Sequence, residues 1–218
     1  MPETTPQPLP SGRRGLDPEV VAASQRARLL DALVALCAES GIESVKIGDL
    51  TARARTAKRT FYAHFDDLQQ CFVEAYDRID EAAFTAIGTG AAPHSAPFPR
   101  IAGAIESLLA YLAEHPSSAN LWVLESHAAG PAAAERRMRT MRQLADLYLA
   151  LHAQVSDEWK PRTPMSRVRA LAVVGAVDLP ATTVLRAEGA AALPGMAAEL
   201  SRAVYLLVYG TDPPDTAS

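Results

Sequence analysis

The chain of 218 residues contains only two cysteines, and aromatic residues make up 6% of it. Cys37 and Cys71 both fall at apolar positions of helical patterns, so we expect buried free thiols in a reducing compartment rather than a disulfide framework. No uninterrupted apolar stretch approaches the roughly 18 residues of a membrane span, and no hydrophobic signal-peptide core follows the N-terminal arginines. We therefore expect a cytoplasmic protein that does not contact a membrane.

Runs of β-branched and aromatic residues are also scarce, and residues 171–177 are the nearest approach to a buried strand. Alanine dominates instead, and alanine and leucine are both strong helix formers. The hydrophobic content of 49% is enough for a sizeable core. Apolar residues spaced three and four apart predict an all-α protein with about nine helices, over residues 18–39, 47–54, 58–64, 67–87, 100–114, 117–129, 132–155, 166–186 and 193–209.

Local signals set the expected ends of these helices. Asp17 and Ser117 are candidate N-caps, and Gly41 is a candidate C-terminal stop. We expect a kink or break at Pro180, because its ring displaces a backbone hydrogen bond. Glycines and prolines cluster in residues 88–99, which predicts a seam between domains.

One segment of this acidic chain is strongly basic. The formal net charge of the whole chain is −4, yet residues 46–65 contain five Lys or Arg residues against one acid, Asp49, a local balance of plus four. The segment is typical of two short helices joined by a tight turn. A basic helix–turn–helix in an acidic protein indicates a polyanionic partner that only this part of the chain meets.

The same segment can form a small core of its own. Leu50, Ala54 and Phe61 are placed to share that core with the helix over residues 18–39, and alanines keep the helix crossing close. Lys and Arg suit phosphates and guanine edges, and Thr suits a phosphate or a thymine methyl group. Residues of these types are left on the outer side of the second helix, namely Thr56, Lys58, Arg59 and Thr60.

Residues 45–76 resemble the N-terminal domain of the TetR family of bacterial transcriptional repressors. The aromatic end, TFYAHF, is the most specific part of the match, and the layout of the remaining chain agrees with the family. The family string IA…AGVS…TLY.HF..K..L is met here by Leu50-Thr51, Ala54-Arg55-Thr56-Ala57, Thr60-Phe61-Tyr62, His64-Phe65, Leu68 and Cys71-Phe72.

The resemblance implies a DNA-binding domain over residues 18–66 and a larger helical domain for ligand sensing and dimerisation over 67–210, with the helix over 67–87 as connector. Proline-rich, polar sequence predicts a disordered arm over 1–17 and a disordered tail over 211–218. The family function would be that of a ligand-responsive regulator, usually a repressor, that binds a palindromic operator in double-stranded DNA as a homodimer. A small molecule of unknown class would release it, and we expect no enzymatic activity, cofactor or metal.

Residues 58–60 face the DNA groove by this resemblance. Tyr62 and His64 either contact the DNA backbone or only cap and pack the three-helix domain, and Arg53 either contacts a phosphate or is simply solvated. The candidate DNA-binding residues are Lys46, Arg53, Arg55, Thr56, Lys58, Arg59, Thr60, Tyr62 and His64.

Three positions depart from the family string. Arg55 replaces the turn glycine, so it must either accept a strained conformation or alter the turn. Ala57 replaces the serine that caps the recognition helix, which leaves Thr56 as the alternative cap. Leu68 replaces a lysine that contacts phosphate in the family, and Arg55 is a candidate to supply that contact instead.

A homodimer is expected because one recognition helix gives little specificity, and paired heads read half-sites about one helical turn (~34 Å) apart. The resemblance places the dimer seam on the last two helices, whose small and apolar stripes agree with it; the alternative is an intramolecular core. The candidate interface residues are Val168, Leu171, Ala172, Gly175, Leu179, Leu200, Val204, Leu207 and Val208.

In the family, the middle helices of the larger domain usually enclose a ligand pocket. Plain core packing is the alternative for every residue proposed to line it. Two of the candidates, Glu125 and His127, are polar within an apolar stretch. The candidate ligand-binding residues are Tyr111, Trp122, Glu125, His127, Met141 and Tyr148.

Two other functions stay open. Arg55, Ala57 and Leu68 would also suit a helical protein that has kept the fold, lost DNA binding and acts through protein or ligand interactions. A metal-dependent helical-bundle enzyme is a remote alternative, because the five histidines are scattered in sequence but a bundle can bring two or three together. No phosphate-binding glycine loop or nucleophile elbow is present.

Overall fold

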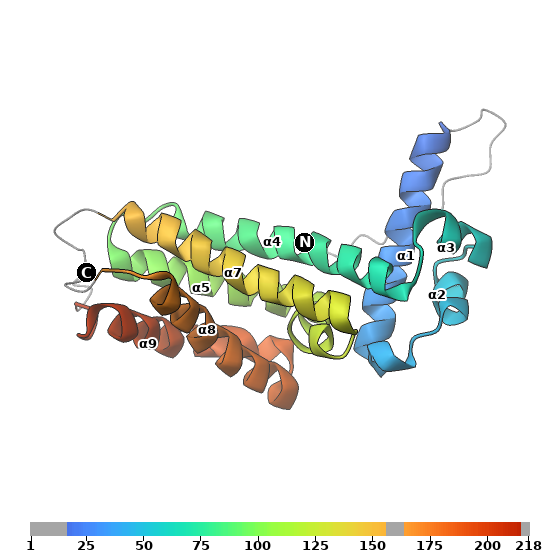
Figure 1. Ribbon diagram of the computed structural model, residues 1–218. Helices are drawn as coiled ribbons and strands as arrows, with labels where there is room; N and C mark the ends of the chain where they lie inside the picture. Colours follow the sequence, from blue (N-terminus) through green and yellow to red (C-terminus); the bar gives the residue numbers. More distant parts are fainter. Residues whose placement is uncertain (1–16, 156–163, 215–218) are drawn as a thin grey trace.

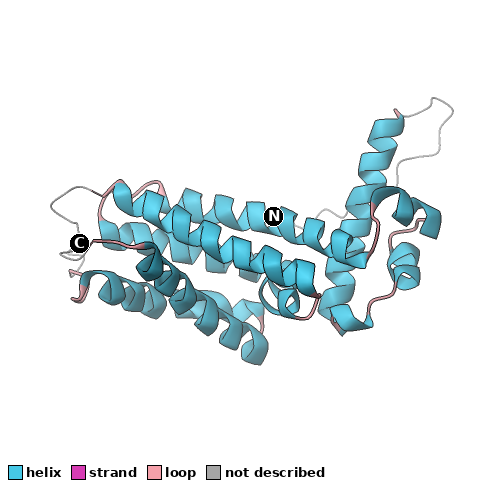
Figure 2. Cartoon of the chain, in the orientation of Figure 1, coloured by secondary structure: helices cyan, strands magenta, loops and turns pink. Residues whose placement is uncertain are grey.

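The computed structural model describes residues 17–155 and 164–214. Most of the predicted disordered arm and the last four residues of the predicted tail lie outside this range, as does the segment 156–163. Within it all regular secondary structure is helical, short loops join the helices, and there is no strand (Figure 2). The predicted all-α class with nine α-helices is confirmed for the described chain.

Three helices form a compact head at one end of the molecule (Figure 1). They are α1 (Pro18–Ser40), α2 (Ile47–Arg53) and α3 (Lys58–His64), and a 3-10 turn, Ile42–Ser44, joins the first two. Leu29, Leu33, Leu50 and Phe61 are fully buried between them. The small core predicted for the helix–turn–helix is therefore present.

The other helices form an elongated body that continues from the head. α4 (Leu68–Ala91), α5 (Pro97–Glu114) and α7 (Pro131–Ala153) run along its length, and α8 (Arg167–Glu188) and α9 (Ala197–Tyr209) lie along one side (Figure 1). The short α6 (Pro116–Ala119) and the turns after it lie near the head. Phe72 and Tyr76 of α4 are fully buried, so one apolar core runs from the head into the body.

Both ends of α1 have the capping residues that were predicted for them. The carboxylate of Asp17 accepts a hydrogen bond from the Glu19 amide at 3.0 Å. Gly41 ends the helix with φ of 74°, a conformation that glycine adopts without strain. Both predictions are confirmed, and Gly41 leads into the 3-10 turn that precedes α2.

The predicted helix over residues 117–129 is wrong in detail. It begins at Pro116 without a side-chain cap, so Ser117 is not the N-cap, and it divides into α6, a π-helical turn (Asn120–Leu124) and a 3-10 turn (Glu125–His127). The π turn buries three consecutive residues, 121–123.

Of the kink or break predicted at Pro180, the break is absent. α8 continues through this proline to Glu188 and ends where Gly189 takes φ of 85°. Proline removes one backbone donor from a helix, and packing of neighbours such as Ala181 and Leu185 into the core holds the remaining turns together.

The glycines expected to mark a domain seam instead mark a close helix crossing. α4 extends to Ala91, four residues beyond its predicted end, and includes Gly88 and Gly90. A Cβ atom on Gly90 would overlap the carbonyl oxygen of Gly103 in α5, and one on Gly103 would overlap the carbonyl oxygen of Gly90. Residues 88–99 thus comprise the end of α4, a short turn over 92–96 and the start of α5, in a tight α4–α5 hairpin inside the body.

Candidate nucleic-acid interface and internal cavity

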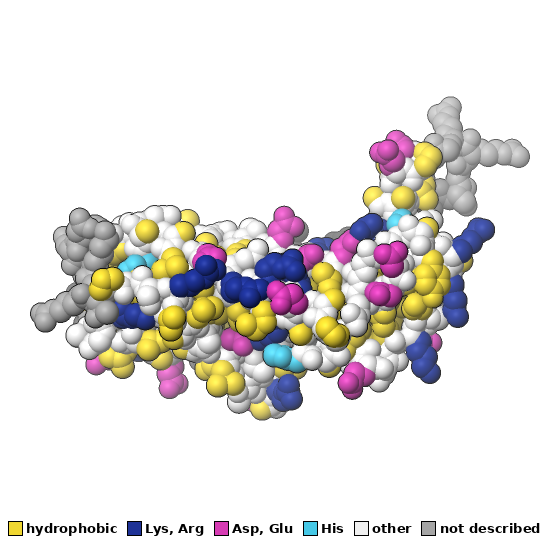
Figure 3. Space-filling view, viewed as in Figure 1, with side chains coloured by type: hydrophobic (Ala, Val, Ile, Leu, Met, Phe, Trp, Pro, Cys, Tyr) yellow, Lys and Arg dark blue, Asp and Glu magenta, His cyan; other side chains and the backbone are white. Residues whose placement is uncertain are grey.

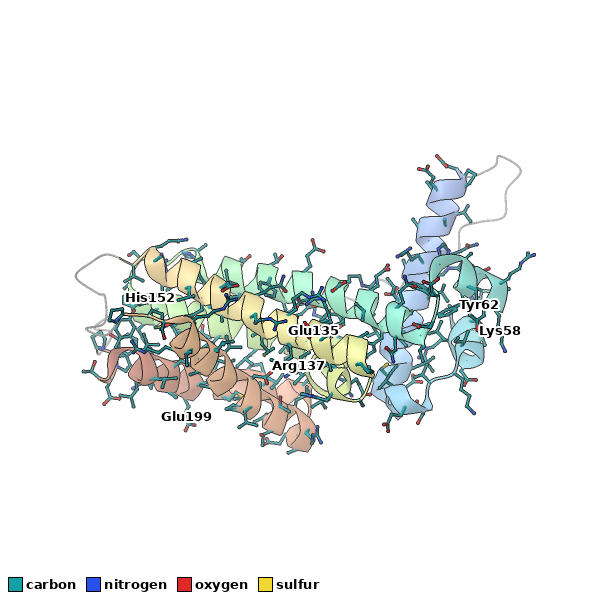
Figure 4. The ribbon with its side chains drawn as sticks, in the orientation of Figure 1. Lys58, Tyr62, Glu135, Arg137, His152 and Glu199 are labelled. Atoms are coloured by element: carbon teal, nitrogen blue, oxygen red, sulfur yellow. The ribbon has the colours of Figure 1, made fainter. Side chains whose placement is uncertain are left out.

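Cationic side chains gather on the face of the head that is turned away from the body. Lys58 and Tyr62 project from α3 at this end of the molecule (Figure 4), and Tyr62 is 58% exposed. Arg59 and Lys46 are also exposed, and Thr60 is half-buried. Figure 3 shows Lys and Arg side chains along this outer edge. The head therefore presents a short helix with free cations and a phenol to any partner that approaches from outside.

The turn between α2 and α3 is built around a strained arginine. Arg55 has φ of 51°, and it is the one non-glycine residue with positive φ among the described residues. Its side chain is exposed, while Arg28 of α1 donates hydrogen bonds to the carbonyl oxygens of Ala54 (3.0 Å) and Arg55 (3.4 Å). Of the two predicted options, Arg55 takes the left-handed conformation and leaves the turn tight.

Thr56 does not play the roles expected of it. Its hydroxyl oxygen is buried without a hydrogen-bond partner, so it neither faces a groove nor caps α3. Ala57 occupies the N-cap position, and no side chain caps the helix there. The tight turn at Arg55 explains the difference, because it directs the Thr56 side chain inward.

Two further candidates are partly engaged within the head. Arg53 forms an ion pair with Glu39, with N–O distances of 2.6 and 2.7 Å. His64 is half-buried, and burial, followed by the nearby Arg26, lowers its pKa below the ordinary value. A neutral, partly packed His64 favours the interpretation that it supports the three-helix core. Leu68 likewise packs against that core.

A charged contact joins the head to the body. The carboxylate of Glu125 accepts a hydrogen bond from the backbone amide of Ile42 at 2.7 Å, just after the end of α1. Close by, Gln69 at the start of α4 lies directly against Gly130. The prediction that Glu125 lines a ligand pocket is therefore wrong: the π and 3-10 turns direct it at the head.

An apolar cavity of about 120 Å³ lies inside the body. α4, α5, α7, α8, α9 and the π-helical turn enclose it, and Trp122, Met141 and Tyr148 are in its wall as predicted. Tyr111 and His127 are not among the lining residues: the Tyr111 ring is tilted by 33° against the His115 ring, with ring centroids 4.7 Å apart, and His127 is exposed. Hydrocarbon side chains make up most of the wall, including Ile101, Ile105, Leu108, Leu109, Leu112, Leu144, Leu147 and Leu151.

Two buried arginines of α7 connect the cavity wall to its surroundings. Arg136 donates to Asp80 of α4 at 2.8 Å and also pairs with Asp77, while the Trp122 indole donates to Asp80 at 3.0 Å. Arg137 lies on α7 facing α8 (Figure 4) and donates to both carboxylate oxygens of Asp178 at 2.8 Å. Such buried pairs fix the relative positions of the helices that carry them.

Asp178 lines the cavity and was missed by reasoning from the sequence. The available signal was its charge in the middle of an otherwise apolar stretch of residues 170–181. Its partner could not be found by spacing, because Arg137 lies 41 residues away.

Among the described residues, no group of three or more His, Cys, Asp or Glu side chains is placed to hold a metal ion.

α8 carries an exposed apolar stripe. Val168 is 76% and Leu179 is 70% exposed, and Leu171, Ala172 and Gly175 lie on the surface between them. By length and composition alone, α8 and the segment Ala190–Tyr209 are each long and apolar enough to cross a membrane. This property was not predicted, because neither segment is an uninterrupted apolar run. Much of the apolar surface of α8 is therefore exposed in the described chain.

The matching stripe predicted on α9 is partly wrong. Leu200, Val204 and Val208 are at most 6% exposed and pack into the core of the chain itself. The exposed apolar residues of α9 are Leu206 and Leu207. The face of α9 that carries the regular apolar spacing is turned toward α5 and α8, because a helix in a bundle buries its most apolar side first.

A basic three-helix head, continued by a long helix into a helical body with an apolar cavity, is the fold of a ligand-responsive DNA-binding regulator. Residues 29–75 match the family model described as bacterial regulatory proteins, tetR family. No curated protein sequence matches the chain. Residues 29–75 therefore form a DNA-binding domain of the TetR type.

Solved structures show the same fold over nearly the whole length. A TetR-like transcriptional regulator from Rhodococcus sp. RHA1 is 19% identical, with 87% of this chain and 98% of that chain covered and a TM-score of 0.63. The fatty acid degradation regulator FadR from Bacillus halodurans is 14% identical, with 89% and 97% covered and a TM-score of 0.70. FadR from Bacillus subtilis, solved in complex with stearoyl-CoA, is 14% identical, with 84% and 98% covered and a TM-score of 0.69.

Proposed function

We propose that this protein is a homodimeric transcriptional repressor that binds a palindromic operator and is released by a small apolar effector. The observation that carries the proposal is the set of exposed cations on α3 and its preceding turn, Arg55, Lys58 and Arg59. Lys58 lies on the side of the head that is turned away from the body (Figure 4), where a DNA duplex can reach it, in a chain whose net charge is −4.

The exposed stripe on α8 supports the dimer. A monomer that left Val168, Leu171 and Leu179 in water would expose a continuous apolar patch, and such patches mark interaction surfaces. Ala172 and Gly175 between them allow a second helix to approach closely, since a Cβ on Gly175 would meet no atom within 4 Å in the protomer. Two heads held by one seam would read two half-sites about 34 Å apart.

The contacts between the head and the body support a response to a ligand. Trp122 lines the cavity, and Glu125, three residues later, bonds to the Ile42 amide of the head. α4 also runs from the cavity wall at Ile87 to the head. A ligand that prefers one arrangement of these elements would shift the spacing of the two heads, whereas a ligand with equal affinity for both would shift nothing.

Retardation of the chain's own upstream DNA tests the proposal. The double variant Lys58→Ala, Arg59→Ala should abolish specific retardation while leaving the helical circular dichroism unchanged. A matched double variant, Arg139→Ala with Arg142→Ala, removes two exposed charges from α7 and should bind like the wild type. For the wild type, affinity should fall steeply with salt, by a slope of about −0.9 per phosphate contact.

Equal binding by the wild type and the α3 variant would show that the recognition helix is assigned wrongly. Binding by neither protein at low salt would favour the other function considered, a helical protein of this fold that acts through protein or ligand contacts alone.

A further inference from the structure

The apolar cavity has one charged residue in its wall, Asp178. Both of its carboxylate oxygens lie 2.8 Å from the same terminal nitrogen of Arg137, and the other terminal nitrogen of Arg137 donates to the carbonyl oxygen of Trp122 at 3.3 Å. The Arg137 side chain is 7% exposed. The pair is therefore neutral overall, and the protein's own acceptors occupy both ends of the guanidinium group.

The other polar groups in the wall are similarly unsuited to an ion. The Trp122 indole donates to Asp80. Burial raises the pKa of Tyr148, so its phenol stays neutral at physiological pH. Apart from these groups, aliphatic side chains and Met141 surround the space. A charged ligand entering here would lose its hydration without finding a free counter-charge, and that loss is costly.

We propose that Asp178 is a specificity-determining residue that neutralises Arg137, so that the cavity accepts uncharged, alkyl-rich molecules and rejects amphiphilic anions. This inference rests on the proposed function, in which the cavity is the effector site. An anionic head group placed at this wall would meet the Asp178 carboxylate before the Arg137 guanidinium. Without that carboxylate, the guanidinium would become a buried cation ready to bind a carboxylate ligand.

The size of the cavity suggests suitable probes. A cavity of about 120 Å³ has room for roughly ten water molecules, a space comparable to that of an alkyl chain of about ten carbons. 1-Decanol and decanoate therefore form a matched pair that differs in the charge of the head group. Both would be titrated calorimetrically into the full-length protein at pH 8.

The wild type should bind 1-decanol at least tenfold more tightly than decanoate. Asp178→Asn preserves the shape of the side chain and removes its charge, and it should raise the affinity for decanoate at least tenfold while changing that for 1-decanol less than threefold. Asp146→Asn is the matched control, since Asp146 pairs with Arg167 at 3.0 Å on the surface. It should leave both affinities unchanged.

Several outcomes would overturn the inference. Equal affinity of the wild type for decanoate and 1-decanol would refute the ligand class. The absence of binding by either probe would also refute it. Neither result depends on a variant that might misfold. An unchanged decanoate affinity in folded Asp178→Asn would refute the role of Asp178.

Retardation of DNA by the same preparations separates this inference from the proposed function. Binding of 1-decanol without release of DNA would support the ligand class and count against the effector step of the proposed function. Release of DNA by decanoate but not by 1-decanol would overturn the inference and leave the proposed function standing.

Discussion

Arg55 offers a test in which stability and DNA binding should change in opposite directions. Its backbone has φ of 51°, whereas its side chain is exposed at the turn before the recognition helix. A residue with a Cβ atom is strained in this conformation by roughly 1–2 kcal/mol, and glycine is not. Glycine in turn has more conformational freedom to lose on folding, which costs about 0.4–1 kcal/mol.

Two substitutions separate these effects. Arg55→Gly and Arg55→Ala both remove the charge, but only Arg55→Gly relieves the strain. The glycine variant should therefore unfold with a free energy about 0.5–1 kcal/mol higher than the alanine variant. For a domain of this size, that difference raises Tm by about 1–4 °C. Urea unfolding followed by circular dichroism would measure it.

DNA binding by the two variants should be equally weakened. If Arg55 contacts one phosphate, each variant should lower the slope of log K against log salt by about 0.9 per head. The reasoning on strain fails if Arg55→Gly is no more stable than Arg55→Ala. The phosphate contact is refuted if both variants keep the affinity and salt slope of the wild type.

Two other predictions concern the body. Gly90→Ala should lower the free energy of unfolding by about 1–2 kcal/mol, because the added Cβ overlaps the backbone of α5. Gly88→Ala should raise it by up to about 1 kcal/mol, because a Cβ there meets nothing within 4 Å. Thermal unfolding would measure both, and a stabilised Gly90→Ala would contradict the close crossing. Leu179→Asp should convert the dimer to a monomer in sedimentation velocity, because it places a charge on the exposed stripe of α8. Val20→Asp, a control at an exposed valine of α1, should leave the dimer intact, and a dimer that persists in Leu179→Asp would place the seam elsewhere.

The head shows how far local sequence can predict structure. The helix over 18–39, its Asp17 cap and its Gly41 stop were predicted because each depends on residues within a few positions of one another. The conformation of Arg55 was one of two options that the family string left open. The inward turn of Thr56 was not predicted, since it depends on how the turn is held by Arg28 from another helix.

The body shows what periodicity leaves open. Regular apolar spacing on α9 identified a buried face, but it could not say whether the covering helix belongs to the same protomer, and Leu200 and Val204 proved to be internal. Glycines in 88–99 had the composition of a loop, yet Gly90 permits a close crossing with Gly103. Both outcomes depend on which surface lies opposite, and that surface comes from a distant part of the chain.

The sequence by itself determined that this chain is helical, where most of its helices lie, and that residues 46–65 form a basic head of the TetR type. These properties arise from side-chain periodicity, caps and local charge, which act over one or two helical turns. Only the tertiary structure decided that Glu125 bonds to the head and that Arg137 neutralises Asp178 in the cavity wall. Those contacts join residues 83 and 41 positions apart, and no short-range pattern in a sequence records which buried charge will find which partner.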